Sequence, residues 1–523
     1  MRKRQPIRRP WSRAVTLVAA MIAVVVPALP MLTPPAVAGP VRTCGSLSRI
    51  SRPDTTVVSA VEDSGDAATP PSCRVTLRIT DPGDGGAVTV WVYLPLDTWN
   101  GRFQAVGGSG FLGGDAARLV GPLRAGYAAA ATDAGHRGSN ADFALKPDGS
   151  LNWPAIKDFG YQGIADMTAA AKAMVRDFYG KDAAYSYFNG CSTGGRQGIT
   201  EAQRHPDDYD GILTGAPVIG YPKLKTGQMW GQVVMLAQGN PVAPCKFKAA
   251  VTAMTGACDT VGDGVRDGVI GDPLQCHFDL SNLVGRATPC GKITAADVEV
   301  MKKIQQGPRR ANGEFLWYGL APGASFAGLN DTVPLNGKLV GAPSISDLSW
   351  FSMFLAQNRS WDWTTLTYPK FEAYFDQAVS TYNDVLGADN PDLSGFARAG
   401  GKLLLWNGEA DFAVPFQGTV DYYRRVQEKL GPGQTQQFLR LFLAPGVDHC
   451  GGGPGPQLAD PLGALVDWVE HGKAPRTLPA VRTGADGSVT ATRPVCMYPN
   501  VARWTGRGDP ADGSTYHCVP ARS

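Results

Sequence analysis

The sequence predicts an α/β fold in which a mainly parallel sheet is interrupted by one large insertion. Apolar strand-like runs alternate with helical runs up to about residue 220 and again after about residue 395. Between those points the alternation disappears, and a structureless loop of that length is not expected in a compact protein. The chain of 523 residues also exceeds one ordinary domain. We therefore expect core segments at 39–220 and 396–523 and an inserted lid domain at 221–395.

The elements of the first core segment follow in chain order. Two strand-like runs, 73–79 and 88–95, are separated by DPGDGG, which favours a hairpin. The next segments predict a short strand before the glycine-rich loop VGGSGFLGG (106–114), a buried strand in AGYAAAATDAG (125–135), a helix over 164–179 and a strand in YSYFNG (185–190).

The second core segment resumes the same alternation. GKLLLWNGEAD (401–411) predicts a strand with a polar loop, and a helix follows through 421–431. FLRLFLAPGVDHC (438–450) predicts another strand and loop, and 462–471 predicts a helix that ends at Gly472. The insertion between the two segments carries four cysteines and an aromatic group at Trp350, Phe351, Trp361 and Trp363.

The first 38 residues predict an export signal. A basic leader precedes a mostly apolar run at 14–27, and AVA stands before Gly39 as a signal-peptidase pattern. The apolar run is short for a membrane span of ~20 residues. Export by the general secretory route is expected, and the paired Arg8 and Arg9 leave a twin-arginine route open. A net charge of only +3, without a later basic cluster, argues against nucleic-acid binding, and we expect no membrane partner.

Ten cysteines in an exported protein predict disulfides. Three pairs are near neighbours in the sequence: Cys44 with Cys73, Cys258 with Cys276, and Cys496 with Cys518. If Cys245 pairs with Cys290, then Cys191 must pair with Cys450. Spacing alone leaves the partners of Cys245 and Cys290 open.

A candidate nucleophile lies in GCSTG (190–194), which matches G-x-S-x-G between an apolar strand and a helix-compatible stretch. A serine hydroxyl is a weak nucleophile unless a base lies within hydrogen-bond reach. Ser192 is therefore the expected nucleophile, and the alternative is a structural serine in a glycine-rich turn.

The base and the acid are expected on later loops of the core, in the chain order serine, acid, histidine. Of six histidines, His449 alone follows an apolar strand near the end of the core. The preceding loop offers Glu409 and Asp411, of which the shorter and more rigid Asp411 is preferred. Asp448 is a poor candidate because it adjoins His449 in the chain.

The cysteines beside Ser192 and His449 predict a clamp. If the serine and histidine side chains approach within ~3 Å, Cys191 and Cys450 come within disulfide reach, with Cα atoms ~5 to 6 Å apart. The alternative is two unrelated cysteines.

These residues resemble the tannase and feruloyl esterase family. GCSTGGRQG, GEAD and GVDHCGGGPGP look like its three catalytic segments, and the likeness extends from about Cys44 to Cys518. The resemblance implies an α/β-hydrolase core, a lid domain and hydrolysis of esters of aromatic acids. It also implies that the cysteines beside the serine and the histidine are bridged.

The oxyanion hole requires two backbone N–H donors. We expect one from Thr193, directly after the nucleophile, and the other from the glycine-rich loop. Gly108 is the first candidate in that loop, followed by Ser109 and Gly110.

The segment CDTVGDGVRDGVI (258–270) resembles the calcium loop of the family's lid. Carboxylates on a tightly turning loop suit Ca²⁺. The resemblance places side-chain ligands at Asp259, Asp263 and Asp267 and carbonyl ligands at Val265 and Val269. One extra residue separates the first two aspartates, and the alternative is an Asp-Gly turn without metal.

The sequence therefore predicts a secreted serine esterase for hydroxybenzoic or hydroxycinnamic esters, with a structural Ca²⁺ and a small-molecule substrate. Trp350 and Phe351 are the candidate pocket contacts, and Arg359 is the candidate partner for a distal carboxylate if the substrate is a terephthalate half-ester. Two other possibilities are a calcium-stabilised binding protein without catalysis and a peptidase or lipase that uses the same triad.

Overall fold

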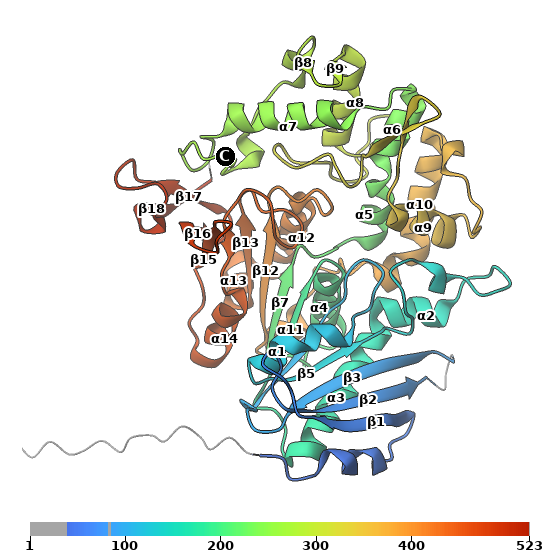
Figure 1. The fold of residues 1–523 in the computed structure, drawn as a ribbon, viewed down its shortest axis with the longest axis vertical. Coiled ribbons are helices and arrows are strands. Elements are labelled where there is room, and N and C mark those ends of the chain that lie inside the picture. The colour runs from blue at the N-terminus through green and yellow to red at the C-terminus, as the bar shows by residue number, and fades with distance from the viewer. Residues whose placement is uncertain (1–38, 82–84, 522–523) are drawn as a thin grey trace, which may run out of the picture. The chain divides into compact units, whose positions relative to one another are not determined.

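A nine-stranded mixed sheet lies at the centre of the protein in the computed structural model, which describes residues 39–81 and 85–521 (Figure 1). The strand order is β1-β2-β3-β5-β4-β6-β7-β12-β13. β1, β2, β3 and β5 pair antiparallel, and the remaining neighbours pair parallel. The strands are β1 (Thr55–Asp63), β2 (Ser72–Thr80), β3 (Ala87–Pro95), β4 (Arg102–Val106), β5 (Ala128–Thr132), β6 (Tyr185–Cys191), β7 (Gly211–Gly215), β12 (Lys402–Gly408) and β13 (Leu439–Ala444).

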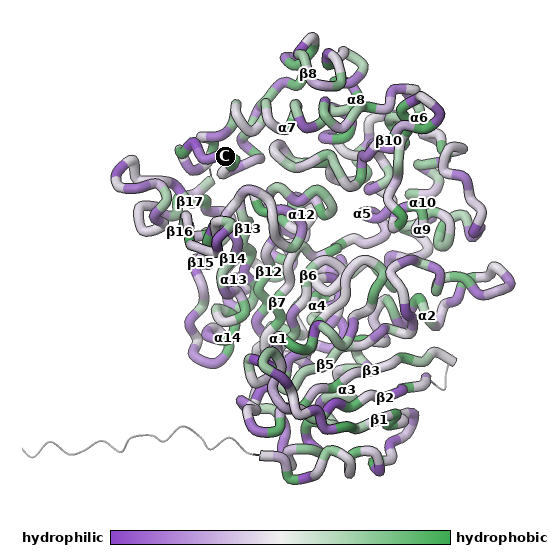
Figure 2. The backbone as a smooth tube through the Cα atoms, viewed as in Figure 1, coloured by the Kyte–Doolittle hydropathy of each residue, from purple (hydrophilic) through white to green (hydrophobic). Residues whose placement is uncertain are grey.

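Helices cover both faces of the sheet because the inner strands are apolar on both sides. Successive residues of β12 pack in different directions: Leu403 and Leu405 belong to one hydrophobic cluster, whereas Leu404 belongs to another. The first cluster includes residues of α3, α4 and α12, and the second includes residues of α14. In Figure 2 the strands of this region are largely hydrophobic. The core helices are α1 (Val120–Arg124), α2 (Trp153–Lys157), α3 (Gly163–Tyr179), α4 (Thr193–Arg204), α12 (Phe416–Leu430), α13 (Pro432–Phe438) and α14 (Pro461–His471).

The segment between β7 and β12, residues 216–401, is here called the insertion. It contributes no strand to the nine-stranded sheet and consists mainly of helices. These helices pack around a hydrophobic cluster separate from the two that cover the sheet. That cluster extends onto core residues such as Phe111 and Phe159, so the insertion and the core pack together. Its helices and strands are α5 (Tyr221–Gln228), α6 (Trp230–Gln238), α7 (Pro244–Cys258), β8 (Ala287–Thr288), β9 (Gly291–Lys292), α8 (Ala295–Gln306), β10 (Thr332–Leu335), β11 (Lys338–Gly341), α9 (Ile345–Ser349), α10 (Tyr368–Leu386) and α11 (Ser394–Arg398).

The C-terminal part of the chain adds two small antiparallel sheets. One has the order β14-β15-β16, and the other pairs β17 with β18. Figure 1 shows β16 to β18 on the same side of the molecule as α7. The strands are β14 (Gln457–Leu458), β15 (Thr477–Thr483), β16 (Val489–Cys496), β17 (Asn500–Trp504) and β18 (Tyr516–Pro520).

The structure confirms the α/β fold and most of the expected elements. The hairpin corresponds to β2 and β3, and the predicted helices at 164–179 and 462–471 correspond to α3 and α14. The fourth antiparallel strand, β1, and the tail sheets were not predicted. The proposed lid limits of 221 and 395 lie at the first residue of α5 and inside α11.

Five disulfides join all ten cysteines: Cys44–Cys73, Cys191–Cys450, Cys245–Cys290, Cys258–Cys276 and Cys496–Cys518. The three pairs of near neighbours and the pair beside Ser192 and His449 were expected, and the structure supplies the Cys245–Cys290 pair that the sequence left open. The expected export signal, residues 1–38, lies outside the described residues. Among residues 39–81 and 85–521, no helix is both long and apolar enough to cross a lipid bilayer.

Candidate active site

Ser192 occupies a sharp turn between β6 and α4. Its backbone has φ 62° and ψ −122°, a left-handed conformation that few non-glycine residues adopt. Glycine is required around it because a Cβ on Gly190 would lie 2.5 Å from the Gly194 carbonyl oxygen. A Cβ on Gly107 would lie 2.4 Å from the Gly194 Cα. The turn therefore presents Ser192 at the carboxyl edge of the parallel strands, as the motif predicts.

The structure brings Ser192, His449 and Asp411 together from three different loops. The Nε2 atom of His449 lies 3.0 Å from the Ser192 Oγ atom, and its Nδ1 atom lies 2.8 Å from the Asp411 Oδ2 atom. Asp411 follows β12 and His449 follows β13, so adjacent parallel strands place both side chains at the same edge. This arrangement allows the histidine to accept a proton from serine while the carboxylate orients the ring.

Asp411 is fixed by its own loop. Its Oδ1 atom accepts hydrogen bonds from the backbone N–H groups of Ala413 and Val414, both at 2.8 Å, which leaves Oδ2 for the histidine. In the described part of the chain the alternative acid, Glu409, makes no hydrogen bond or ion pair with His449, and burial raises the pKa of its carboxyl group well above the ordinary range. Asp448 accepts the backbone N–H of His449 at 2.7 Å and so supports the loop rather than the ring.

The pKa of His449 is raised above its ordinary value. Burial is the largest single influence and acts to lower the pKa, because it disfavours the charged imidazolium. The hydrogen bond and the negative charge of Asp411, together with the charge of Asp448, act in the opposite direction and outweigh burial. The surroundings of His449 thus stabilise its protonated form.

The disulfide between Cys191 and Cys450 links the serine loop to the histidine loop. The S–S distance is 2.06 Å, the Cα atoms are 5.9 Å apart, and 259 positions separate the two residues in the sequence. Cys450 also has a positive φ of 61°. The covalent bond therefore holds two strained turns, each of which carries one partner of the Ser192–His449 hydrogen bond.

The structure corrects the expected choice of the second oxyanion donor. The N–H of Gly108 already donates to the Gln197 Oε1 atom at 2.9 Å, because Gln197 reaches back from the first turns of α4. The N–H of Ser109 donates to the Leu112 carbonyl oxygen at 3.1 Å. For Gly110 and Thr193, no hydrogen bond from the N–H is found in the described chain, and the Thr193 Oγ1 atom donates to the Gly110 carbonyl oxygen at 2.5 Å. Gly110 replaces Gly108 as the candidate.

The expected substrate contacts are also corrected. Trp350 and Phe351 have no exposed surface, because they belong to the hydrophobic cluster of the insertion. Trp350 donates to the Thr226 hydroxyl at 3.0 Å, and Phe351 stacks on Trp361. Arg359 donates to the Leu145 carbonyl oxygen and lies 3.8 Å from Asp142. The structure does not place these three side chains with the triad.

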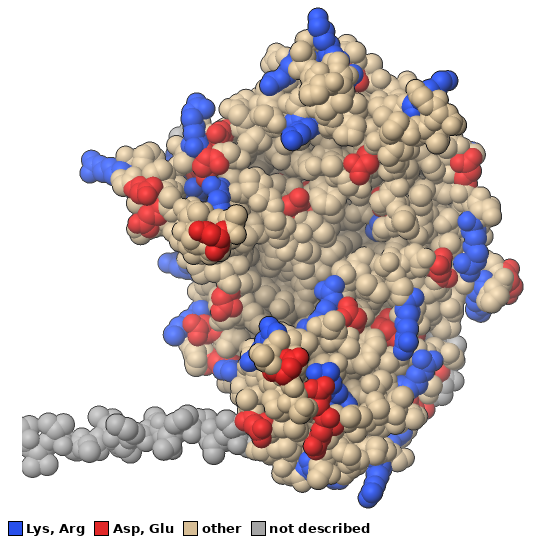
Figure 3. Space-filling model, in the orientation of Figure 1, with Lys and Arg blue, Asp and Glu red and all other residues tan. Residues whose placement is uncertain are grey.

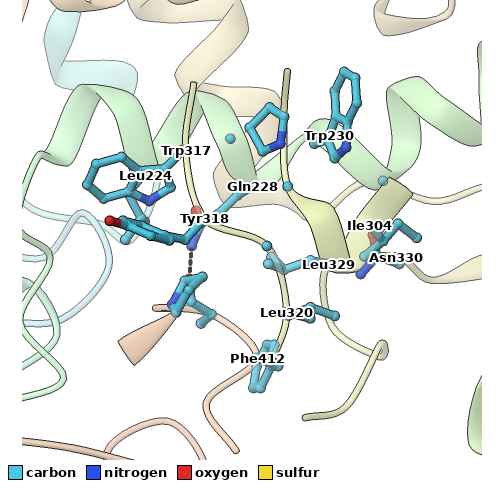
Figure 4. Close-up of a pocket in the computed structure, with 17 residues that line it drawn as sticks. Leu224, Gln228, Trp230, Ile304, Trp317, Tyr318, Leu320, Leu329, Asn330 and Phe412 are labelled. Atoms are coloured by element: carbon cyan, nitrogen blue, oxygen red, sulfur yellow. Dashed lines mark hydrogen bonds between the residues drawn. The ribbon is translucent and has the colours of Figure 1, made fainter. Parts of the chain in front are cut away.

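A pocket between the insertion and the Asp411 loop was not predicted. Figure 4 shows Phe412 and Trp317 on its wall, and Gln228 donates to the Ala413 carbonyl oxygen at 2.9 Å. The Phe412 ring also meets the His449 ring edge to face, with centroids 6.4 Å apart. The space enclosed is about 40 Å³, enough for water but too small for an aromatic ring without side-chain movement. No charged residue lines it.

The face of the molecule drawn in Figure 3 has fewer charged side chains near its centre than at its edges. Figure 3 shows a hollow near the centre of the face, and most Lys, Arg, Asp and Glu side chains lie around its edges. A hollow of this composition favours an uncharged ligand over a charged one.

The predicted calcium loop is closed by its own hydrogen bonds and by an arginine. The Oδ1 atoms of Asp263 and Asp267 accept backbone N–H groups of the loop, and their Oδ2 atoms lie 2.6 and 3.0 Å from the guanidinium nitrogens of Arg493. The Asp259 Oδ1 atom accepts the N–H groups of Asp267 and Gly268. Over the described ranges, no three His, Cys, Asp or Glu side chains converge on one point.

The donor chemistry of this loop nevertheless suits a hard cation. Burial is the largest influence on the pKa of Asp263 and raises it. The hydrogen bond from the Val265 N–H and the charge of Arg493 lower it, and the net result is a pKa of about 6. The neighbouring Asp267 and Asp259 charges add to that rise. Arg482 also lies near the loop, 3.6 Å from the Asp267 Oδ2 atom, so two arginines pair with these aspartates, and calcium stays a prediction.

The sheet, the elbow and the Ser192–His449–Asp411 geometry define the class of protein when they are joined to the comparisons with known proteins: the chain is a carboxylic ester hydrolase with an α/β fold. The family model described as Tannase and feruloyl esterase matches residues 73–519. The chain belongs to the tannase and feruloyl esterase family.

Similar proteins cover most of the chain. A probable feruloyl esterase of Arthroderma benhamiae is 42% identical over 460 residues, which are 86% of this chain and 85% of that protein. The mono(2-hydroxyethyl) terephthalate hydrolase of Piscinibacter sakaiensis is 32% identical, over 87% of this chain and 85% of its own. The solved structure of a tannin acyl hydrolase from Aspergillus niger superposes with a TM-score of 0.79 at 26% identity and covers 89% of this chain and 90% of its own.

Proposed function

We propose that this chain is an exported serine esterase that hydrolyses esters of hydroxybenzoic or hydroxycinnamic acids. The observation that carries the proposal is the continuous hydrogen-bonded line from Ser192 through His449 to Asp411, with distances of 3.0 and 2.8 Å. A binding protein without catalysis would have no need for this geometry, which makes that alternative the weaker one.

The reaction proceeds through an acyl-enzyme. Ser192 attacks the ester carbonyl carbon while His449 accepts the hydroxyl proton at Nε2, and His449 then returns that proton to the departing alcohol. Water, deprotonated by His449, then attacks the acyl-enzyme. His449 returns this proton to the Ser192 Oγ atom as the acyl–oxygen bond breaks and the acid is released. Asp411 keeps the imidazole in the required tautomer and stabilises its charged form.

The negative charge that develops on the carbonyl oxygen is stabilised by backbone N–H groups. Thr193 and Gly110 are the proposed donors, because both N–H groups lack another acceptor in the described chain and the two residues are in contact. Thr193 is also the first residue of α4, whose N-terminal dipole favours a negative charge.

The proposed acyl group is aromatic and uncharged at its far end. The support comes from relatives named feruloyl esterase and tannase and from the uncharged aromatic pocket that reaches Phe412 beside His449. A terephthalate half-ester is the second candidate, since one relative carries that name. It receives less support because its distal carboxylate requires a cation, and Arg359 is engaged by Asp142 and Leu145.

A substrate panel tests this assignment. Methyl gallate, methyl ferulate, methyl p-coumarate, a terephthalate half-ester and an aliphatic methyl ester of similar size are compared by kcat/KM, with the Ser192→Ala variant as background. We expect an aromatic hydroxy-acid ester to give the highest kcat/KM. Preference for the aliphatic ester would contradict the aromatic assignment, and preference for the half-ester would select the second candidate.

Calcium is proposed as a structural ion of the loop at 258–270. Asp259, Asp263 and Asp267 would hold it through carboxylates, and Val265 and Val269 would hold it through carbonyl oxygens. Bound there, the ion would hold the three carboxylates together and would stabilise the loop, without taking part in ester hydrolysis.

Export is proposed from two features. Five disulfides are expected in an oxidising compartment, and the first 38 residues have the composition of an export signal. Intact and N-terminal mass measurement of the protein from culture medium tests this, and a cytosolic, reduced protein would contradict it.

A further inference from the structure

The oxyanion loop, residues 107–114, contains a tight turn whose two central carbonyl oxygens are both held by side chains. Ser109 and Leu112 close the turn through reciprocal backbone hydrogen bonds of 3.1 and 2.9 Å. Between them, the Gly110 carbonyl oxygen accepts the Thr193 hydroxyl, and the Phe111 carbonyl oxygen lies 2.5 Å from the His136 Nε2 atom. The Gly110 N–H belongs to the peptide between Ser109 and Gly110, whose carbonyl oxygen accepts the Leu112 N–H. The next two peptides of the turn are held by one donor from the nucleophile helix and one from His136, so these donors position the Gly110 N–H through the turn.

His136 is aimed at the oxyanion loop by a tightly packed turn after β5. Ala134 has a positive φ of 50°, and the backbone N–H of His136 donates to the Asp133 carbonyl oxygen. The two loops touch so closely that a Cβ on Gly113 would lie 2.3 Å from the Ala134 Cβ. The imidazole ring stacks on Phe143, with centroids 3.8 Å apart. The ring therefore has little freedom to turn away.

The hydrogen bond to Phe111 fixes the tautomer of His136. Burial lowers the pKa of His136, despite the opposing effects of the two carbonyl oxygens that face the ring, so the neutral form with one N–H is favoured. Nδ1 lies 3.1 Å from the Ala134 carbonyl oxygen, a longer contact than the one that Nε2 makes. The single proton is accordingly placed on Nε2, which donates it to the Phe111 carbonyl oxygen.

We propose that His136 is a positioning residue for ester hydrolysis: it holds the turn at Gly110 and Phe111 so that the Gly110 N–H faces the developing oxyanion. This inference rests on the proposed serine esterase function. His136 touches neither Ser192 nor the carbonyl of the substrate in this account, and it acts only through the backbone of the oxyanion loop.

Three variants of His136 separate positioning from packing. His136→Phe keeps a ring that can stack on Phe143 but removes the donor, whereas His136→Gln loses the ring but places an N–H near the position of Nε2. His136→Asn is polar like glutamine but is too short to reach the Phe111 oxygen. If the hydrogen bond to the Phe111 oxygen matters, His136→Gln retains kcat, whereas His136→Phe and His136→Asn lose it. If packing matters, phenylalanine is the best tolerated of the three.

The readouts are kcat, KM, and the inhibition constant of a boronic acid that forms a tetrahedral adduct with the active-site serine. Loss of a well-aimed oxyanion donor lowers kcat by ~100-fold or more, so a misaimed one is expected to lower kcat by ~10- to 100-fold. We expect that range for His136→Phe and His136→Asn, with KM changed by less than about 3-fold and boronic acid affinity weakened in parallel with kcat. His136→Gln is expected to stay within about 5-fold of the wild-type kcat.

Arg118→Ala is the matched control, because Arg118 contacts the same loop on its exposed side through the Ser109 hydroxyl at 2.8 Å. It is expected to leave kcat unchanged. Melting temperatures of all variants show whether they fold, and the Gln and Asn pair decides the question if His136→Phe does not fold.

Two results would overturn the inference: wild-type kcat in folded His136→Asn, or a lower kcat in His136→Gln than in His136→Phe. Ser192→Ala, assayed in the same series, separates this failure from a failure of the proposed function. An active Ser192→Ala protein would remove the function itself, whereas an inactive one with active His136→Asn would remove only the positioning role.

Discussion

Each catalytic residue has a support of its own besides its contacts with the other two. The backbone strain at Ser192 is maintained by glycine contacts, Asp411 is held by two N–H groups of its own loop, and the backbone of His449 is held by Asp448. Because the supports are separate, removal of one catalytic side chain should leave the loops that carry the other two in place.

Ser192→Ala and His449→Ala should each lower kcat by ~10³-fold or more while the fold is retained, because members of a triad act as a unit. The double variant should be little worse than either single one. Esterase assays with matched circular dichroism spectra test this prediction. A folded Ser192→Ala protein with substantial turnover would contradict the assignment.

On the acidic side, kcat/KM should fall with a midpoint above pH 6.5, the ordinary pKa of histidine, because the pKa of His449 is raised. This fall is here called the acid limb. His449 must be neutral to accept the serine proton, so activity falls as the pH decreases through that raised pKa. The effect on stability has the opposite sign: the contribution from protonated His449 is complete below its unfolded pKa and is lost as the pH rises through its folded pKa.

Asp411→Asn should move the acid limb to lower pH and reduce the maximal rate, because it removes the charge that raises the pKa of His449. Glu409→Gln is the matched control and should leave the acid limb in place. A shift with Glu409→Gln and none with Asp411→Asn would make Glu409 the orienting acid.

The sequence predicts the triad at residue scale because each member belongs to a short local pattern at the end of a strand. The donor of the oxyanion loop could not be predicted in this way. Gly108 and Gly110 are alike in the sequence, and only the packing of α4 shows that Gln197 occupies the Gly108 N–H. The prediction that Trp350 and Phe351 contact the substrate was wrong for a similar reason, since an aromatic cluster has the same composition in a core and in a pocket.

At the scale of elements, the Cys191–Cys450 disulfide joins the loops after β6 and β13. Replacing both cysteines with alanine should lower kcat more than it raises KM, because the serine and histidine loops lose their mutual alignment. The thermal midpoint should also fall, since the bond closes a long loop.

The matched control for the clamp is replacement of Cys496 and Cys518, which are joined in the tail. That variant should lose thermal stability with little change in kcat. Equal kcat values for the two double variants, with both proteins folded, would show that the Cys191–Cys450 bond contributes only stability.

Calcium binding is a second prediction at this scale. Chelation should lower the melting temperature while leaving kcat at low temperature nearly unchanged, because the loop lies outside the triad. Asp263→Asn should abolish the chelator effect. Elemental analysis without calcium, together with an unchanged melting temperature, would show that the loop is held by its hydrogen bonds and arginines without a metal ion.

At the scale of the whole molecule, the sheet and the insertion differ in how far the sequence predicts them. Apolar runs between helices predict parallel strands, and the strands that carry the triad were predicted in their chain order. The insertion was recognised only by the loss of that pattern, because its helices are shaped by contacts distant in sequence, such as Trp350 with Thr226. The C-terminal sheets were missed for the same reason: Arg493 is buried against aspartates 230 and 226 positions away.

The central claim, that Ser192 is the nucleophile of this ester hydrolase, is tested most directly by covalent labelling. The folded protein is inactivated with a fluorophosphonate, and the modified peptide is identified by mass spectrometry. We predict one adduct per chain, located on Ser192, with loss of esterase activity in proportion to labelling and no adduct in Ser192→Ala. An adduct on another residue that tracks the loss of activity, or full activity in a protein labelled at Ser192, would contradict the account.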